Sequence, residues 1–347
     1  QQDIALKTFD RLIAEYKNGS YTAKSILRQG LIYYNSDRSN EALNKFKKVA
    51  ADFSKTPEAL EAVSTARLIY VDGGRVNEYA TWVRTLDFVT VTDVELDNDS
   101  YESAVKQFEQ NNNKQAISGF NAYIASFPTG IHSVQANFYL AQAYYSEGQT
   151  DNSIANYQYV IDQPRSEFTE QSLARLSQVL LDNDEKEKAI PVLIRLENEA
   201  DFPQNKVFAQ SNLMKCYYDK QDYSSSVVYA EKVLNNAKMD DNVKSDAEII
   251  IARSAIKTGD ESKARLGYAK LLAIAKGELA AEALYYDAYF KNKDGKFEAS
   301  NVAVQKLAKN YSSYRYFGAK GLILMAKNFY GLKDSFQATY ILDNVIQ

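Results

Sequence analysis

The chain offers few side chains that could carry out chemistry. His132 is its only histidine and Cys216 its only cysteine. These counts exclude an internal disulfide, a Cys-based zinc site and an iron–sulfur cluster, and they remove most metal and acid–base constellations. A lone histidine at the start of a predicted helix is usually structural or exposed. Cys216 lies one residue from an apolar stripe, so we expect it to be a buried, inert thiol.

Acidic and glycine-rich segments fit turns better than active sites. The clusters Asp182-Asn183-Asp184-Glu185 and Asp240-Asp241 lack the EF-hand layout, and carboxylates suit the positive end of a helix dipole. The segment Asp72-Gly73-Gly74-Arg75 follows no buried strand, so it does not predict a phosphate-binding loop. No Gly-x-Ser-x-Gly motif is present. We therefore predict that the chain is not an enzyme and has no catalytic residue, cofactor or metal site.

The composition indicates a helical protein. Of 347 residues, 45% are hydrophobic and 25% charged, while Gly (14) and Pro (5) are scarce. No stretch approaches the roughly 18 apolar residues of a transmembrane helix. The net charge of −4 has the wrong sign for a general nucleic-acid binder, so we expect no nucleic-acid partner.

A repeat of about 37 residues runs through the whole chain. Small residues recur at an average interval of 37, at Ala5, Ala42, Ala80, Ala116, Ser153, Ala189, Ser226, Ala264, Ala299 and Ala338. Apolar residues follow four and seven positions later, which is the stripe of an amphipathic helix. Arg84 is the exception four positions later, so the register of the second repeat can be one residue out. A second apolar stripe precedes each small residue, so every unit predicts a hairpin of two helices, A and B.

Short polar turns separate helix A from helix B. Residues that tolerate a left-handed conformation mark them, at 35–37, 146–148, 182–184, 219–221, 258–260 and 331–333. Four of the five prolines lie between units, whereas Pro191 lies inside a predicted B helix, which is kinked there or starts late. A small residue at the crossing lets paired helices approach closely. The predicted fold class is all-α, an αα superhelix (solenoid) of about nine helical hairpins.

The register also predicts how the chain is divided. It opens in a B helix (2–17) and closes in another (332–346), with ten B and nine A helices, and the apolar last helix is not a polar cap. We therefore expect a piece of a longer array. The segment Asp87–Ser100, rich in β-branched and acidic residues, interrupts the repeat pattern, so we predict a linker there. The expected domains are an N-terminal array, 1–95, that starts mid-repeat, and a C-terminal array, 96–347, that ends mid-array.

The small column and the aromatic residues four positions later resemble the tetratricopeptide repeat. A narrower resemblance, over residues 98–200, is to envelope proteins of Gram-negative bacteria: the Tol–Pal-associated YbgF/CpoB proteins and the assembly lipoprotein BamD. It is carried by Phe120-x-x-Tyr123-Ile124-x-x-Phe127-Pro128-x-Gly130 and by the run from Ala136 to Tyr145. The chain departs from the repeat at its usual tryptophan, since Trp82, its only one, lies in a predicted B helix.

The resemblance implies a non-enzymatic scaffold of the cell envelope that binds a partner protein or peptide along its concave face. The expected location is the periplasm or the outer membrane, with periplasmic or outer-membrane proteins as partners. Two alternatives remain open: a cytoplasmic scaffold or regulator, and a non-catalytic arm of a larger envelope enzyme. Sequence beyond either end of the chain would separate them.

The family's concave positions map onto helix A of several units. The candidate partner-binding residues are Tyr34, Phe138, Gln142, Tyr145, Arg175, Gln178, Lys215, Tyr218 and Arg253. Tyrosine and arginine often dominate binding energy. We expect Tyr33, Tyr144 and Tyr217 to be core, and their neighbours Tyr34, Tyr145 and Tyr218 to point about 100° away, toward the surface. The Lys and Asn pattern of chaperone-binding repeats is absent, since Leu27 and Leu31 occupy the corresponding positions in one unit.

Overall fold

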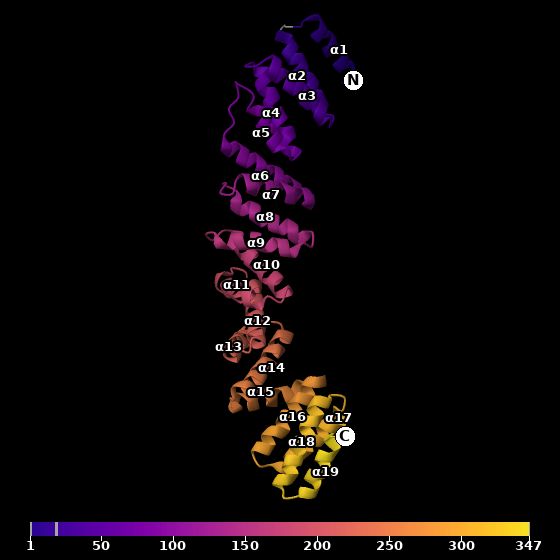
Figure 1. Cartoon of the computed structure of the whole chain (residues 1–347), viewed down its shortest axis with the longest axis vertical. Helices are drawn as coiled ribbons and strands as arrows, with labels where there is room; N and C mark the ends of the chain where they lie inside the picture. Colours follow the sequence, from indigo (N-terminus) through magenta and orange to yellow (C-terminus); the bar gives the residue numbers. More distant parts are fainter. Residues whose placement is uncertain (1, 18–19, 347) are drawn as a thin grey trace. The chain divides into compact units, whose positions relative to one another are not determined.

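The computed structural model describes residues 2–17 and 20–346, which form nineteen α-helices (Figure 1). The B helices are α1 (Gln2–Glu15), α3 (Ser39–Asp52), α5 (Val76–Val83), α7 (Asn113–Ser126), α9 (Thr150–Asp162), α11 (Lys186–Glu199), α13 (Tyr223–Asn235), α15 (Glu261–Ile274), α17 (Phe297–Asn310) and α19 (Ser335–Ile346). The A helices are α2 (Ser20–Tyr34), α4 (Pro57–Asp72), α6 (Asp93–Glu109), α8 (Ser133–Ser146), α10 (Thr169–Asp182), α12 (Pro203–Asp219), α14 (Asp241–Thr258), α16 (Gly277–Lys293) and α18 (Arg315–Gly331). The all-α fold class and the alternation of ten B and nine A helices are confirmed for the described residues.

Every turn from an A helix to its B helix contains one residue with positive φ. These residues are Asp37, Gly74, Asn111, Gly148, Asp184, Gln221, Gly259, Gly295 and Lys333, with φ between 57° and 77°. All six turns predicted from the sequence are among them. Because each ends its A helix in the same way, the turn residue gives a common register for the nine hairpins.

This register corrects two positions of the small-residue column. The residue five positions after the turn residue is Tyr79 in the second hairpin and Ser300 in the eighth, and both are buried. The neighbouring Ala80 is half-buried, and Ala299 is exposed. The column was therefore one residue out at these two places, because the turn geometry, and not the size of the side chain, sets which residue faces the partner helix. The second apolar position is correspondingly Val83 and not Arg84.

Close helix approach explains why small residues recur. An added Cβ at Gly267 in α15 would lie 2.8 Å from Cβ of Ala252 in α14. An added Cβ at Gly119 in α7 would lie 3.0 Å from Cβ of Ala104 in α6. At both crossings the backbones are in near contact, so larger side chains around them fill the core.

The segment Asp87–Ser100 is a linker only in its first half. Residues 93–100 belong to α6, which begins with a capping box: the Thr92 side chain accepts from the Glu95 backbone N–H, and the Glu95 carboxylate accepts from the Thr92 backbone N–H. The acidic residues therefore start a helix, and the prediction of a linker was wrong from Asp93 onward. Pro191 lies inside α11, which begins five residues earlier at Lys186, so a late start is excluded.

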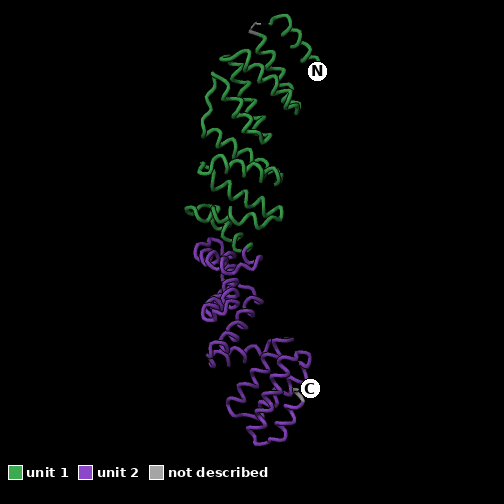
Figure 2. The backbone as a smooth tube through the Cα atoms, viewed as in Figure 1, with its two compact units in different colours: residues 1–179 green, residues 180–347 purple. Residues whose placement is uncertain are grey.

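The chain divides into two compact units, residues 1–179 and 180–347 (Figure 2). Within each unit, consecutive helices pack against one another, as α2 does with α3 and α12 with α13. The domain boundary expected near residue 95 stays a prediction. None of the described helices is long and apolar enough to cross a membrane.

Candidate partner-binding surface

In the first unit, five of the expected binding residues lie on the A helices α8 and α10, and four of them share one surface. The guanidinium carbon of Arg175 lies 4.7 Å from the ring centre of Tyr145, which makes a cation–π contact between the two helices. Gln142 lies one turn before Tyr145, and Gln178 lies one turn after Arg175. All four side chains are half-buried. The structure thus brings α8 and α10 candidates together on one surface.

Phe138 is not on that surface. Its side chain is only 6% exposed, and its ring centre lies 4.8 Å from that of Phe168, just before α10. The expectation that Phe138 faces a partner was therefore wrong, because the segment that leads into α10 covers this face of α8. Tyr34, in the first hairpin, is half-buried and packs against the core around Phe46.

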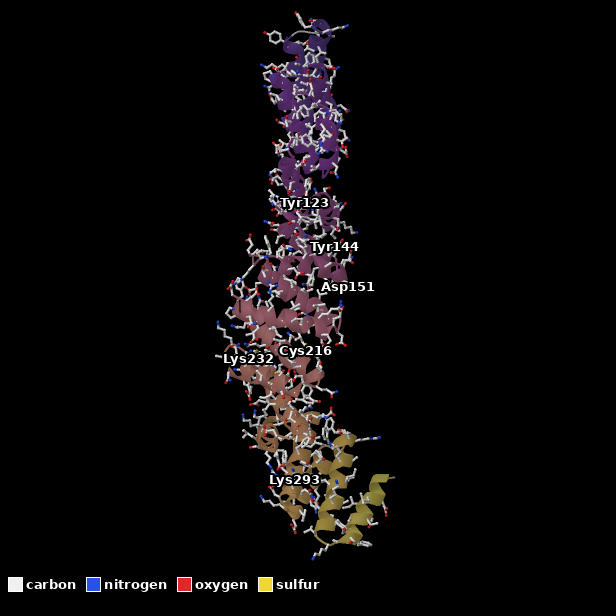
Figure 3. The ribbon with its side chains drawn as sticks, turned by 60° about the vertical axis from the view of Figure 1, so that its left-hand side comes forward. Tyr123, Tyr144, Asp151, Cys216, Lys232 and Lys293 are labelled. Carbon is white, nitrogen blue, oxygen red and sulfur yellow. The ribbon has the colours of Figure 1, made fainter. Side chains whose placement is uncertain are left out.

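The expected contrast between neighbouring tyrosines is absent. Tyr33 and Tyr34, Tyr144 and Tyr145, and Tyr217 and Tyr218 are all half-buried. Tyr144 (Figure 3) accepts a hydrogen bond from the Asn121 amide at 3.0 Å, and Tyr217 stacks on Tyr229 with ring centres 5.6 Å apart. An A helix contacts several neighbours, so two side chains about 100° apart can both border a contact.

In the second unit, the cationic candidates are paired within the chain. Lys215 of α12 lies 2.9 Å from Asp246 of α14, and both side chains are about half exposed (50% and 46%). Such an exposed pair is weak and exchanges readily with a partner's charge. Arg253 of α14 instead forms a bidentate ion pair with Glu282 of α16, and the Glu282 carboxylate is buried.

A tyrosine completes the Arg253–Glu282 pair. The hydroxyl of Tyr268 in α15 donates to Glu282 Oε1 at 2.7 Å. Hydrogen bonding to Glu282 raises the pKa of Arg253, while burial is the main cause that raises the pKa of Tyr268. Burial also raises the pKa of Tyr218. One carboxylate therefore satisfies donors from two other helices.

Sequence reasoning missed an aromatic pocket in the second unit. A cavity of about 260 Å³ lies between the α14–α15 turn and α16. Its walls include Tyr285, Tyr286, Tyr289 and Phe290, with Lys293 at one side. The signal was present as the run Tyr285-Tyr286-x-x-Tyr289-Phe290 in one A helix, but only the fold shows that a cavity lies beside it.

The single histidine and cysteine have structural surroundings. The His132 ring stacks on Tyr101 with centres 4.1 Å apart, and its Nε2 lies 2.7 Å from Asn98 Oδ1. Cys216 (Figure 3) is 2% exposed, and burial raises the pKa of its thiol, as expected of an inert residue. Among the described residues no group of three or more His, Cys, Asp or Glu side chains could hold a metal ion.

Comparison with known proteins identifies the repeat. A family model described as "Tetratricopeptide repeat-like domain" matches residues 90–211. No curated protein sequence matches the chain. Proteins of this repeat type are generally interaction scaffolds, and the matched model does not indicate a catalytic family.

Several solved structures are similar at low identity. The human IFIT1 dimer with m7Gppp-AAAA is 12% identical, with 99% of this chain and 94% of that chain covered and a TM-score of 0.32. The C-terminal part of a TPR repeat-containing protein from Cytophaga hutchinsonii is 14% identical, with coverages of 70% and 93% and a TM-score of 0.37. The apo form of RapI is 14% identical, with coverages of 94% and 96% and a TM-score of 0.36. The matched model identifies a tetratricopeptide-like repeat over residues 90–211, and the described residues outside this range form hairpins of the same two-helix type.

Proposed function

We propose that this protein is a non-enzymatic scaffold that binds an extended segment of a partner protein across its A helices. The observation that carries the proposal is the surface formed by Gln142, Tyr145 and Arg175. It combines a large ring, an amide and a cation on two successive A helices. Such amphipathic side chains bury much area while they keep polar groups for hydrogen bonds, which favours binding to a peptide.

The finer proposal is that the partner belongs to the bacterial cell envelope. Its support is the sequence resemblance over residues 98–200 to YbgF/CpoB and BamD-type proteins. A cytoplasmic scaffold and a non-catalytic arm of a larger envelope enzyme are the competing locations. Fractionation of cells that express the full-length gene tests this: a protein recovered only from the cytosol would contradict the envelope proposal.

The binding surface itself is tested by affinity capture from envelope and cytosolic fractions, with mass spectrometry. The variant Tyr145→Ala with Arg175→Ala removes the cation–π pair, and Gln158→Ala, on the exposed face of α9, is the control. We expect a small set of partners that the control retains and the double variant loses. Partners retained by both would place the binding surface elsewhere. Circular dichroism of each variant checks that the helices remain folded.

A further inference from the structure

Two hairpins of the chain can be aligned on their turn residues, Gly148 and Gly259, both in the left-handed conformation. Nine residues after the turn residue stands a buried tyrosine in each, Tyr157 in α9 and Tyr268 in α15. Six residues before the turn residue, the two hairpins carry Gln142 in α8 and Arg253 in α14. The same positions of the repeat therefore carry a tyrosine hydroxyl and a nitrogen donor in both units.

In the second unit, these donors share one carboxylate. Glu282, only 5% exposed, accepts from Tyr268 Oη at 2.7 Å, from Arg253 Nε at 3.0 Å and from Arg253 Nη2 at 2.5 Å. The carboxylate charge strengthens each of these three hydrogen bonds.

In the first unit, the corresponding donors have no partner. The Tyr157 side chain is fully buried (0% exposed), and neither its hydroxyl nor Gln142 Nε2 has a hydrogen-bond partner. The position of Glu282, thirteen residues before the next turn residue, is taken by Gln171, which is neutral and exposed. Buried donors are almost always paired in native proteins, so two unpaired donors at matching positions indicate a site for an acceptor.

A cation lies near the Tyr157 hydroxyl. Arg175 and Tyr286 occupy equivalent positions, because each lies nine residues before the next turn residue, Asp184 or Gly295. Tyr286 stacks on Tyr268 with ring centres 4.2 Å apart. Arg175 is correspondingly near Tyr157, whose pKa burial raises and the Arg175 charge lowers. No carboxylate in the described part of the chain forms an ion pair with Arg175, whose contact is the ring of Tyr145.

We propose that α8, α9 and α10 bind the carboxylate of an acidic side chain, Glu or Asp, of the partner peptide. The carboxylate accepts hydrogen bonds from Tyr157 Oη and Gln142 Nε2 and pairs with Arg175. This inference rests on the proposed scaffold function and names the chemistry of its partner. We assign the carboxylate to a side chain and not to a chain terminus, because the equivalent carboxylate in the second unit, that of Glu282, belongs to a side chain within a helix.

Binding requires one small movement. The two donor atoms have almost no exposed area, and the Arg175–Tyr145 pair is the half-buried contact next to them. Rotation of Arg175 away from the Tyr145 ring would open the site. A cation–π contact at a partly exposed position is weak, so charge-assisted hydrogen bonds to a carboxylate replace it favourably.

The site can be tested first without any partner. Gln171→Glu places a carboxylate at the position of Glu282, and we expect it to raise the thermal midpoint by about 2 °C. Gln115→Glu is the matched control, because Gln115 is also an exposed third residue of its helix (α7) and gains the same helix-dipole benefit. Tyr157→Phe keeps the buried ring and removes only the hydroxyl. In that background we expect the gain from Gln171→Glu to fall by half or more.

The second test uses peptides whose two ends are blocked by acetylation and amidation. Fluorescence anisotropy compares decapeptides with a central Glu, with a central Gln, and with a neutral centre but a free C-terminal carboxylate. We expect the Glu peptide to bind at least tenfold more tightly than the Gln peptide. Tyr157→Phe should reduce that preference, and Gln171→Glu should abolish it because its own carboxylate occupies the donors.

The outcomes separate this inference from the scaffold function. If Gln171→Glu stabilises no more than Gln115→Glu, and the Glu and Gln peptides bind equally, the carboxylate site is overturned while the scaffold function stands. If Gln171→Glu stabilises through Tyr157 but no peptide binds, the site accepts a carboxylate and the scaffold function fails at this surface. Preference for the free C-terminal peptide would overturn the assignment to a side chain.

Discussion

Gly267 lies where α15 passes closest to α14, and its replacement by alanine tests whether this contact limits stability. The new Cβ would lie 2.8 Å from Ala252 Cβ and 3.1 Å from Ala252 Cα. Carbon atoms prefer separations of about 3.5–4.0 Å, so the helices must move apart by roughly 1 Å. Because the neighbouring atoms belong to the backbone and to a methyl group, no flexible side chain can give way.

Two effects oppose each other in this variant. Overpacking a core costs about 1–3 kcal/mol, whereas alanine favours the helix over glycine by about 1 kcal/mol. We therefore expect Gly267→Ala to lower the free energy of unfolding by about 1 kcal/mol. Gly318 in α18 is the control, because a Cβ there would meet nothing within 4 Å. Gly318→Ala should raise the free energy of unfolding by up to about 1 kcal/mol.

Urea unfolding followed by far-ultraviolet circular dichroism measures both variants. The contrast between them, about 2 kcal/mol, is larger than either effect alone. Gly267→Ala as stable as the wild type, or more stable, would refute the reasoning that α14 and α15 are in limiting contact at this point.

Three further predictions concern charge, ionisation and thiol reactivity. Arg67→Ala leaves the buried Asp99 carboxylate (2% exposed) without its ion pair and should destabilise the protein by about 3 kcal/mol, whereas Arg11→Ala, which removes an exposed surface pair, should leave the midpoint of the same urea assay nearly unchanged. Burial raises the pKa of Tyr286 to about 12, so the folded chain keeps a proton that the unfolded chain loses near pH 10. The free energy of unfolding should fall between pH 10 and 12, and a Tyr286→Phe variant should lose less over that range. Cys216 should react with a thiol reagent only as the protein unfolds. If the folded protein were labelled as fast as the protein unfolded in urea, the burial of Cys216 would be contradicted.

The sequence by itself determined the helices and their repetition. The apolar stripe and the polar turns depend on local spacing, which is present in every unit, so nine hairpins could be predicted without coordinates. The same local signals predicted the burial of Cys216. They failed at Ala80 and Ala299, because a small residue next to the buried position satisfies the pattern equally well.

Only the tertiary structure decided which candidate side chains are partnered. Phe138 and Tyr145 both lie on α8, yet one is covered by Phe168 and the other meets Arg175. Hydrogen bonds between residues about thirty positions apart depend on how neighbouring hairpins stack, which no local spacing encodes. The same repeat positions therefore form a closed network around Glu282 in one unit and leave the Tyr157 hydroxyl unpaired in the other.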